Sequence, residues 1–241
     1  MSLIEPLLLS SSHISTYAGT QQLTNASSFF FQRDERLFVV TSRHVLFDEA
    51  NNHRPDSVSV VVHNNPANMA SSICYSLPLY CNGQPLWRQG GDSAGDVDVA
   101  VLEVDRTQLP PDVLLIPFTP AHLTQHFDQI EVGTPLLVVG FPLGFHDTLH
   151  HMPVVRQAVI ASSFGLRFQG LGFFLTDART HRGSSGGAVV THRPELGELP
   201  WLLLGVHSAR LDLACRDLAQ DEALGLNSAW YADILMTLTE N

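Results

Sequence analysis

The stretch of this chain best suited to chemistry is a serine pair flanked by glycines, Gly183-Ser184-Ser185-Gly186-Gly187. Glycine lets the backbone turn sharply and lets a substrate carbonyl come close to the main chain. Backbone N–H groups at such a turn can converge on one point, which the stabilisation of an oxyanion requires. A hydroxyl alone is a weak nucleophile, so it also needs a base and a group that orients the base. The chain must therefore supply a histidine and an acid elsewhere.

A histidine and an aspartate upstream each stand at an apolar, strand-like segment. His44 follows the apolar run 37–40, and Asp98 begins the segment Asp-Val-Ala-Val-Leu. Taken singly, each has a more ordinary interpretation, namely a packed or surface histidine and a structural salt bridge. A buried carboxylate is costly unless it is paired, and Asp96 is a competing acid on the same strand face. The order His44, Asp98, Ser185, each in a matching local context, predicts a catalytic triad.

The serine segment also satisfies the Gly-x-Ser-x-Gly pattern of α/β-hydrolases, whose partners follow in the order serine, acid, histidine. The last histidine of this chain is His207, 22 positions after Ser185, and the acids between them are Glu195 and Glu198. That length is too short to return an acid and a histidine from separate strand ends of a large sheet. The α/β-hydrolase interpretation is therefore excluded.

Five segments around these residues form a set. They are FVVTSRHV (38–45), DVAVLEV (98–104), GFPLG (140–144), TDARTHRGSSGGAVV (176–190) and LLLGVHSA (202–209). With this set the chain resembles the chymotrypsin-fold serine peptidases, and it is most similar to their bacterial Deg/HtrA and glutamyl-endopeptidase branches. The resemblance covers residues 27 to 229. It implies an all-β fold of two six-stranded antiparallel β-barrels with the active site between them.

The resemblance also implies a role for each matching residue. Ser185 is expected to be the nucleophile and His44 the general base and then acid, while Asp98 holds the imidazole tautomer and stabilises the imidazolium. The oxyanion hole is expected in the segment Gly183, Ser184 and Ser185, from the N–H groups of its first and last residues. The substrate is a polypeptide, and no cofactor or metal is implied.

The primary specificity of such a peptidase depends on residues just before the nucleophile. Arg179 stands where an aspartate would select Lys or Arg, so a trypsin-like preference is not expected. Thr180 and His207 resemble the pair with which glutamyl endopeptidases and picornaviral cysteine peptidases bind a Glu or Gln side chain. A hydroxyl and an imidazole can both donate to a carboxylate or amide oxygen. The alternatives are a small apolar preference, or a Thr180 that caps a turn beside a structurally satisfied His207.

Two further groups of residues flank this site. The edge Ser208, Ala209 and Arg210 is expected to pair with the substrate backbone by strand addition, and Arg210 either attracts acidic side chains or is simply solvated. Histidines four positions apart can share a metal on a helix face, which raises a metal site as an alternative for one loop. The residues concerned are His146, Asp147, His150 and His151. Because they follow GFPLG, where the family has a flexible loop, solvated histidines are expected instead.

Composition and charge restrict the class of protein, its partners and its location. The 241 residues include 44% apolar and 15% charged residues, which is typical of a well-packed globular protein. A net charge of −11 opposes a phosphate backbone, so no nucleic-acid partner is expected. The start of the chain lacks the basic residues of a signal peptide, and no apolar stretch is long enough to cross a bilayer. A cytoplasmic location without membrane contact is therefore expected. The three cysteines, Cys74, Cys81 and Cys215, are expected to be free thiols.

Strand-like segments about ten residues apart predict the scaffold that must bring these residues together. They fall at 27–32, 37–41, 57–63, 76–80, 85–88, 97–104, 134–141, 154–163, 172–177, 187–192, 201–208 and 224–229. The proline-rich stretch 106–131, with a helical candidate at 121–129, separates two sets of strands. The expected units are an N-terminal extension (1–26), a barrel with His44 and Asp98 (27–108), a connection (109–131), a barrel with Ser185 (132–229) and a C-terminal helix (230–241).

Two other functional interpretations stay open. A protease-fold protein can bind partners without cutting them, although such proteins usually lack a triad member and none is missing here. An enzyme can also be latent, with the loop Arg182 to Ser184 misformed until a partner or substrate binds. The Deg branch often has proline at the position of Arg182. Without that proline the backbone conformation of the loop is less constrained. Only about 12 residues follow the last expected strand, so no PDZ-like segment is expected.

Overall fold

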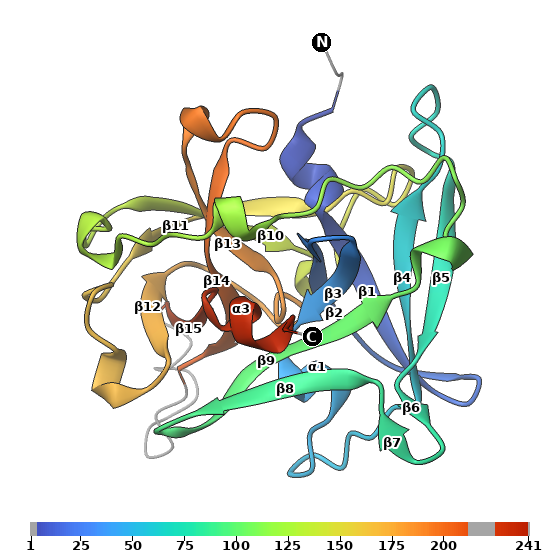
Figure 1. Cartoon of the computed structure of the whole chain (residues 1–241), viewed down its shortest axis with the longest axis horizontal. Helices are drawn as coiled ribbons and strands as arrows, with labels where there is room; N and C mark the ends of the chain where they lie inside the picture. The colour runs from blue at the N-terminus through green and yellow to red at the C-terminus, as the bar shows by residue number, and fades with distance from the viewer. Residues whose placement is uncertain (1–3, 212–224, 241) are drawn as a thin grey trace.

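Two antiparallel β-sheet units lie side by side in the computed structural model, which describes residues 4–211 and 225–240 (Figure 1). The N-terminal unit is a seven-stranded sheet in the order β5-β4-β1-β2-β3-β9-β8. Its strands are β1 (Ser11–Ala18), β2 (Gln21–Arg33), β3 (Arg36–Thr41), β4 (Ser57–His63), β5 (Ser72–Pro78), β8 (Trp87–Asp92) and β9 (Gly95–Val104). A small hairpin, β6 (Tyr80–Cys81) with β7 (Gln84–Pro85), joins β5 to β8.

The C-terminal unit is a closed barrel of six strands in the order β10-β11-β12-β15-β14-β13. Its strands are β10 (Pro135–Gly140), β11 (Val154–Ile160), β12 (Phe173–Asp177), β13 (Ala188–His192), β14 (Trp201–Arg210) and β15 (Leu226–Tyr231). The predicted strand 224–229 begins one residue outside the described part of the chain. Six strands in this unit agree with the expectation from the sequence.

The two antiparallel units confirm the predicted all-β fold class, and the N-terminal unit has seven strands in its sheet where six were predicted. Its end strands are β5 and β8, and they are not paired with each other. Pro78 ends β5, and Pro85 lies two positions before β8 begins. Each proline pairs with one strand, Pro78 with β4 and Pro85 with β6, but proline has no N–H to donate to a further strand. The chain turns between these prolines, so the sheet stays open at this point.

Most of the segment 11–26 belongs to the N-terminal sheet, as β1 and the first part of β2, and does not form the separate extension that the sequence suggested. β1 lies inside the sheet, paired with β2 on one side and with β4 on the other. Several of its buried residues are polar, including Ser12 and Thr16. The Ser12 hydroxyl donates to Val61 O at 2.7 Å, and Thr16 shares a hydrogen bond with Thr24. Hydroxyls satisfied in this way can be buried, which hides the apolar alternation by which strands are identified.

Short helices complete the fold. They are the 3-10 turns η1 (Pro6–Ser10), η2 (Arg106–Gln108), η3 (Pro120–His122), η4 (Phe127–Gln129), η5 (Pro142–Gly144), η6 (Phe168–Gly170) and η7 (Pro194–Leu196), and the α-helices α1 (Arg43–Leu46) and α3 (Ile234–Leu238). No helix among the residues described has the length and apolar character that crossing a bilayer requires. The helix predicted at 121–129 is replaced by η3 and η4, because Leu123 between them is extended and bridges to Leu203 in β14.

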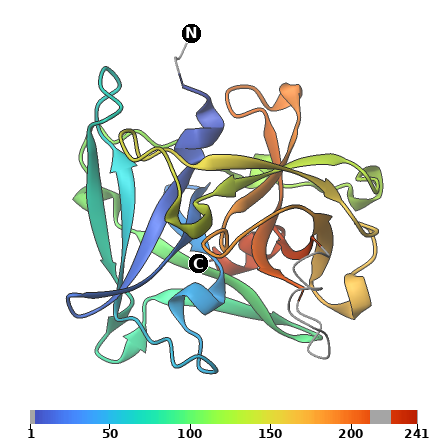
Figure 2. The same cartoon turned by 180° about the vertical axis from the view of Figure 1, so that it is seen from behind.

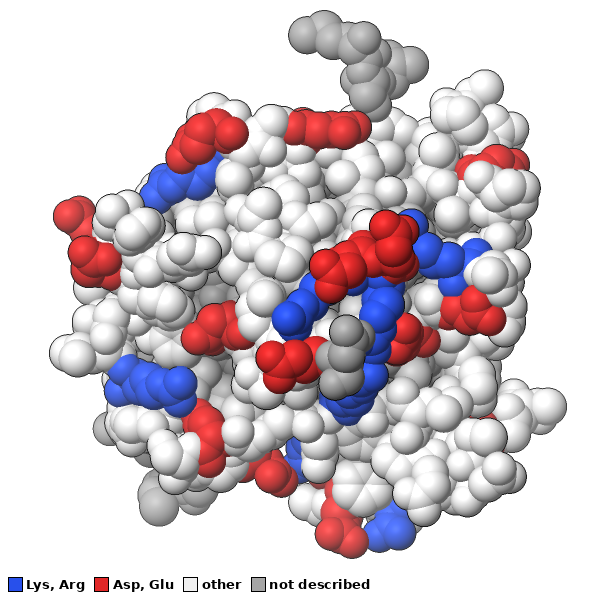
Figure 3. Space-filling view, in the orientation of Figure 1, with Lys and Arg blue, Asp and Glu red and all other residues white. Residues whose placement is uncertain are grey.

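α3 ties the end of the chain to the N-terminal sheet. Leu235 and Leu238 are buried, and the carbonyls at its end accept hydrogen bonds from arginines of that sheet; Arg33 donates to Met236 O at 2.5 Å. Beside it, Glu103 pairs with Arg36 at 2.6 Å and with Arg88 at 3.8 Å. Figure 3 shows both signs of charge mixed in this region of the surface. The helix therefore fastens the two units to each other.

Three apolar cores hold the molecule together. One fills the N-terminal sheet and another fills the C-terminal barrel. The third lies between the two units, where Phe29, Phe38 and Val99 meet Val139 and Val206. β9 serves two of these cores, because Ala100 and Leu102 face the N-terminal core while Val99 and Val101 face the shared one. This shared core fixes the relative position of the units and therefore of any site at their junction.

Candidate functional site

Ser185 lies in the loop between β12 and β13 in the C-terminal barrel. Gly186 follows it with a φ of +84°, which favours glycine. A Cβ at Gly186 would lie 2.2 Å from Ser27 O and 2.2 Å from Thr41 Oγ1, so no side chain fits there. Both of those atoms belong to the N-terminal sheet. The glycine after Ser185 thus allows the loop to press against the opposite unit.

His44 and Asp98 come from the N-terminal unit and contact each other directly. His44 lies in α1, one turn after β3, and Asp98 lies on β9. Asp98 accepts two hydrogen bonds from His44, one from the backbone N–H to Oδ1 at 2.9 Å and one at Nδ1 to Oδ2, at 2.8 Å. The Ser208 hydroxyl donates to the same Oδ2. The carboxylate is thereby held in one orientation against the imidazole.

The surroundings of this pair shift both pKa values toward the charged forms. Burial disfavours a charged His44, but the hydrogen bond and the charge of Asp98, with a smaller effect of Asp48, outweigh it and raise the pKa of His44. Burial likewise opposes the Asp98 carboxylate, yet the bonds from His44 and Ser208 lower its pKa. An imidazole in this environment is a stronger base than a free one.

Ser185 and His44 line one cavity of about 450 Å³ at the junction of the units. Thr24, Asn25 and Asp48 also belong to its lining. The Ser185 hydroxyl donates to Ser208 O at 2.8 Å, and no hydrogen bond joins it to His44 in the part of the chain that the structure describes. Catalytic hydrogen bonds are often long or absent without substrate. Rotation about one side-chain bond is the movement that would turn the hydroxyl from Ser208 toward His44.

Hydrogen bonds to its carbonyl groups fix the main chain before Ser185. Arg182 O accepts from Leu143 N at 2.6 Å, and Gly183 O accepts from Ser27 Oγ at 2.7 Å. In a trans peptide, the C=O and the following N–H point in opposite directions. The Gly183 N–H therefore points away from Leu143. Among the described residues, neither the Gly183 N–H nor the Ser185 N–H donates a hydrogen bond.

Ser184 lies between the two expected oxyanion donors, Gly183 and Ser185. Its N–H donates to His181 O at 3.1 Å, so it is not available to an oxyanion. Its carbonyl accepts from Gly187 N at 3.0 Å, which closes a tight turn around Ser185. The geometry of an oxyanion hole thus rests on Gly183 and Ser185, and Ser184 stabilises the turn that carries them.

Asp96, the competing acid, lies away from His44. Its side chain is 68% exposed, and its ion pair is with Arg43 at 3.8 Å. The two acids are thus in different environments on one strand, and the structure brings Asp98 to His44.

Thr180 and His207 are both buried close to the nucleophile loop. The Thr180 hydroxyl donates to Asn227 Oδ1 at 2.5 Å, and both protons of the Asn227 amide are used by the carbonyls of Ala178 and Gly225. His207 Nδ1 has no hydrogen-bond partner among the described residues. Burial, with a smaller effect of His44, lowers the pKa of His207 to about 4. Thr180 therefore does not cap a turn, and His207 is not a histidine with both ring nitrogens hydrogen-bonded.

The remaining predicted substrate residues lie on two adjacent segments. Arg179 is exposed, and its carbonyl accepts two hydrogen bonds from the Arg156 guanidinium. A register shift in β14 between His207 and Ala209 separates Ser208 from the regular pairing with β15. Arg210 pairs through its backbone with Asn227, while its side chain lies outside the described part of the chain.

Two serines make contacts at the site that the sequence interpretation did not assign to them. Ser208 was expected to pair with substrate, yet its hydroxyl also holds Asp98. Ser27 was assigned only to a strand, and it contacts the nucleophile loop from the other unit. These contacts span 110 and 156 residues of sequence, and no local pattern encodes them. Only the repeated small polar residues in buried strands could have pointed to them.

The histidines of the loop after β10 interact with one another and with their own backbone. His150 pairs with Asp147 at 2.6 Å, and His146 Nδ1 bonds Gly144 O at 2.6 Å. The His146 ring stacks on His13 and on His151. Within residues 4–211 and 225–240, no group of three or more potential ligands is arranged to hold a metal ion. Cys74 and Cys81 are free and exposed, whereas Cys215 lies outside the described residues.

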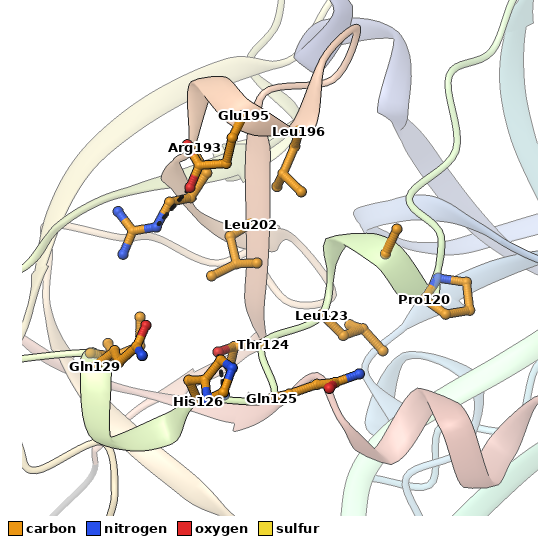
Figure 4. A pocket seen from close by; sticks show the side chains of 12 residues that line it. Pro120, Leu123, Thr124, Gln125, His126, Gln129, Arg193, Glu195, Leu196 and Leu202 are labelled. Atoms are coloured by element: carbon orange, nitrogen blue, oxygen red, sulfur yellow. Dashed lines mark hydrogen bonds and ion pairs between the residues drawn. The ribbon is translucent and has the colours of Figure 1, made fainter.

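A second cavity, of about 310 Å³, lies between the η3–η4 connection and the β13–β14 hairpin (Figure 4). Its lining includes Leu123, His126 and Leu202, and an ion pair joins Arg193 to Glu195 at 4.0 Å. No member of the predicted triad reaches it. Of these two cavities, the one at Ser185 combines a nucleophile with a base.

Comparisons with known proteins identify a family and a similar fold. A family model described as "trypsin-like peptidase domain" matches residues 26–196. The structure is similar to that of the serine endoprotease from Yersinia pestis, with a TM-score of 0.55 and 19% sequence identity. That similarity covers 95% of this chain and 61% of the Yersinia protein. No curated protein sequence matches this chain significantly.

Proposed function

Because this chain belongs to the family of trypsin-like peptidases, we propose that it is a serine endopeptidase acting through His44, Asp98 and Ser185. The observation that carries the proposal is the Asp98–His44 pair, 2.8 Å apart, in the cavity that also contains Ser185. The substrate is a polypeptide, as for any peptidase.

The proposed reaction begins with proton transfer from the Ser185 hydroxyl to His44 Nε2. The oxygen forms a bond to the scissile carbonyl carbon, and the resulting oxyanion accepts from the N–H groups of Gly183 and Ser185. Asp98 stays ionised and stabilises the imidazolium. His44 then returns the proton to the leaving amine, and the peptide C–N bond breaks. Water repeats the sequence on the acyl-enzyme, releasing the acid and restoring Ser185.

Substitution of the nucleophile tests the mechanism. Ser185→Ala is expected to reduce peptide hydrolysis by about 10,000-fold or more, since removing any triad member leaves only residual catalysis. The measurement is turnover of a peptide library by intact protein and variant, with serine-directed phosphonate labelling in parallel. A folded protein that neither labels at Ser185 nor cuts peptides would instead be a protease-fold binding protein. The unpaired N–H groups of Gly183 and Ser185 speak against a latent enzyme with a misformed loop.

Thr180 and His207 support a preference for Gln or Glu before the scissile bond, and their hydrogen bonds favour Gln. The Thr180 proton is already given to Asn227, so its oxygen is left with lone pairs that accept. A glutamine amide supplies the matching N–H, whereas a carboxylate supplies none at neutral pH. His207 is neutral above about pH 5 because burial lowers its pKa to about 4, so it brings no positive charge to balance a carboxylate.

Matched peptides that differ only in Gln or Glu before the cut test this preference. We expect kcat/KM for Gln to exceed that for Glu by about tenfold or more, because a buried, unbalanced carboxylate is costly. Peptides with Ala at that position measure the competing small apolar preference. Faster cleavage after Ala than after Gln would contradict the assignment of Thr180 and His207, and would leave the triad unaffected.

A further inference from the structure

We infer that Ser27 is a positioning residue that holds the oxyanion loop of the C-terminal barrel from the opposite unit; this rests on the proposed function. Ser27 lies on β2 and is completely buried. It touches neither the cavity at Ser185 nor the triad side chains. Its role is therefore to fix the atoms that contact the substrate.

The Ser27 hydroxyl connects two loops of the other unit through one oxygen. It donates to Gly183 O at 2.7 Å, and it accepts from Phe141 N at 2.8 Å. Phe141 begins the loop whose Leu143 N–H holds Arg182 O. The hydroxyl thus contacts the peptide after Gly183 directly, and through 141–143 it supports the peptide before Gly183.

The main chain of Ser27 adds a second connection. Its N–H donates to Ser185 O at 2.9 Å, and its carbonyl accepts from the Thr41 hydroxyl at 2.9 Å. Ser27 therefore holds two carbonyls of the loop, those of Gly183 and Ser185. The Thr41 bond in turn fixes Ser27 to β3, directly before α1 and His44.

These bonds determine where the free N–H groups point. Four successive peptides of the loop have their carbonyls held: Arg182 O by Leu143, Gly183 O and Ser185 O by Ser27, and Ser184 O by Gly187. A peptide whose carbonyl is fixed cannot rotate its N–H. Without the Ser27 hydroxyl, the Gly183 carbonyl and the Phe141 N–H both lose their partner. The segment 141–143 can then shift, and with it Leu143, whose N–H holds the Arg182 carbonyl and thereby fixes the direction of the Gly183 N–H.

The fit around Ser27 is close. A Cβ at Gly140 would lie 2.3 Å from Ser27 Oγ, so a glycine at 140 leaves the space that the hydroxyl occupies. Seen from behind, the loop after β10 lies at the junction of the two units, beside β2 (Figure 2). The contact is thus one between the units and not a local feature of a single sheet.

Ser27→Ala is the test, with Ser28→Ala as its matched control. Ser28 is the next residue, is equally buried, and donates to Ser12 O at 2.9 Å within its own unit. Each variant loses one buried hydroxyl, so both are expected to lower the melting temperature. Ser27→Ala is expected to lower it more, because it leaves both Gly183 O and Phe141 N unpaired, whereas Ser28→Ala leaves only Ser12 O unpaired. Only Ser27→Ala is expected to lower kcat, by about 10- to 100-fold with little change in KM, because misplaced oxyanion donors weaken the transition state alone.

Two further measurements separate positioning from general damage. Affinity for a peptide trifluoromethyl ketone, which binds as an oxyanion, is expected to fall with kcat in Ser27→Ala and to stay constant in Ser28→Ala. Amide hydrogen exchange of residues 182–187 is expected to accelerate only in Ser27→Ala. Equal kcat and equal exchange in the two variants would overturn the inference. If the unmodified protein cuts no peptide, the proposed function fails, and the exchange of 182–187 still decides whether Ser27 holds the loop.

Discussion

Two histidines near Ser185, one half-buried and one buried, have opposite electrostatic environments. His44 faces the Asp98 carboxylate, which raises its pKa, whereas burial lowers the pKa of His207 to about 4. His44 is partly open to a cavity, and His207 is 2% exposed with an unpaired Nδ1. The same side chain is therefore a proton acceptor in one place and a neutral hydrogen-bonding group in the other. A partner carboxylate, and not burial by itself, decides which of these properties a histidine has.

Removing the carboxylate gives the largest expected effect, because it makes His44 resemble His207. Asp98→Asn keeps the shape of the side chain but removes its charge and favours the wrong imidazole tautomer. We expect kcat/KM to fall by about 10,000-fold. Steady-state hydrolysis of the Gln peptide measures this, with circular dichroism to verify folding. An Asp98→Asn enzyme within tenfold of the original would show that Asp98 is not the orienting acid.

The pH dependence of the reaction should show the titration of His44 and not that of His207. His44 must be neutral to accept a proton, and its pKa is raised, so kcat/KM is expected to rise with pH through a midpoint above about 6.5. Below that midpoint the rate should fall about tenfold per pH unit. His207 is neutral throughout this range, so the ratio of Gln to Glu cleavage should stay constant from pH 6 to 9. A second midpoint in that ratio would contradict a permanently neutral His207.

The sequence predicted the triad because each member stands in a short, distinctive segment. His44 follows a strand of apolar residues, Asp98 begins another, and Ser185 is flanked by glycines that the turn requires. The fold class and the six strands of the C-terminal barrel could be predicted for the same reason, since they depend on local periodicity. Their boundaries differ from the prediction by a few residues, as strand ends depend on pairing partners.

What the sequence could not provide are the contacts between distant polar residues. Ser27 and Gly183 lie 156 residues apart, and a buried serine gives no local pattern that identifies its partner. β1 was not predicted as a strand for a similar reason, because several of its buried residues are serines and threonines and do not alternate with apolar residues. The direction of the Thr180 hydrogen bond also depends on Asn227, which only the folded chain places beside it. Sequence patterns indicate which groups are present, whereas the three-dimensional arrangement determines which atoms donate and which accept.

The hydroxyl oxygen of Thr180 is the group assigned to accept from a glutamine side chain, and it can be removed by substitution. Thr180→Val removes the oxygen that accepts from a glutamine amide, so the ratio of kcat/KM for Gln over Glu is expected to fall about fivefold. Thr180→Ser keeps the hydroxyl and is expected to keep the ratio. The valine variant also leaves Asn227 Oδ1 without its donor, so its stability is measured in parallel. An unchanged ratio in a folded Thr180→Val enzyme would exclude Thr180 from contact with the substrate side chain.

The smallest expected effect comes from the acid that does not face His44. Asp96 is 68% exposed, and its partner Arg43 lies 3.8 Å away, so solvent screens most of their attraction. Asp96→Asn is expected to change the free energy of unfolding by less than about 0.5 kcal/mol and kcat/KM by less than about twofold. Urea denaturation and hydrolysis of the Gln peptide measure both. A loss approaching that of Asp98→Asn would mean that the catalytic carboxylate had been assigned to the wrong aspartate, since the two substitutions remove the same charge from the same strand.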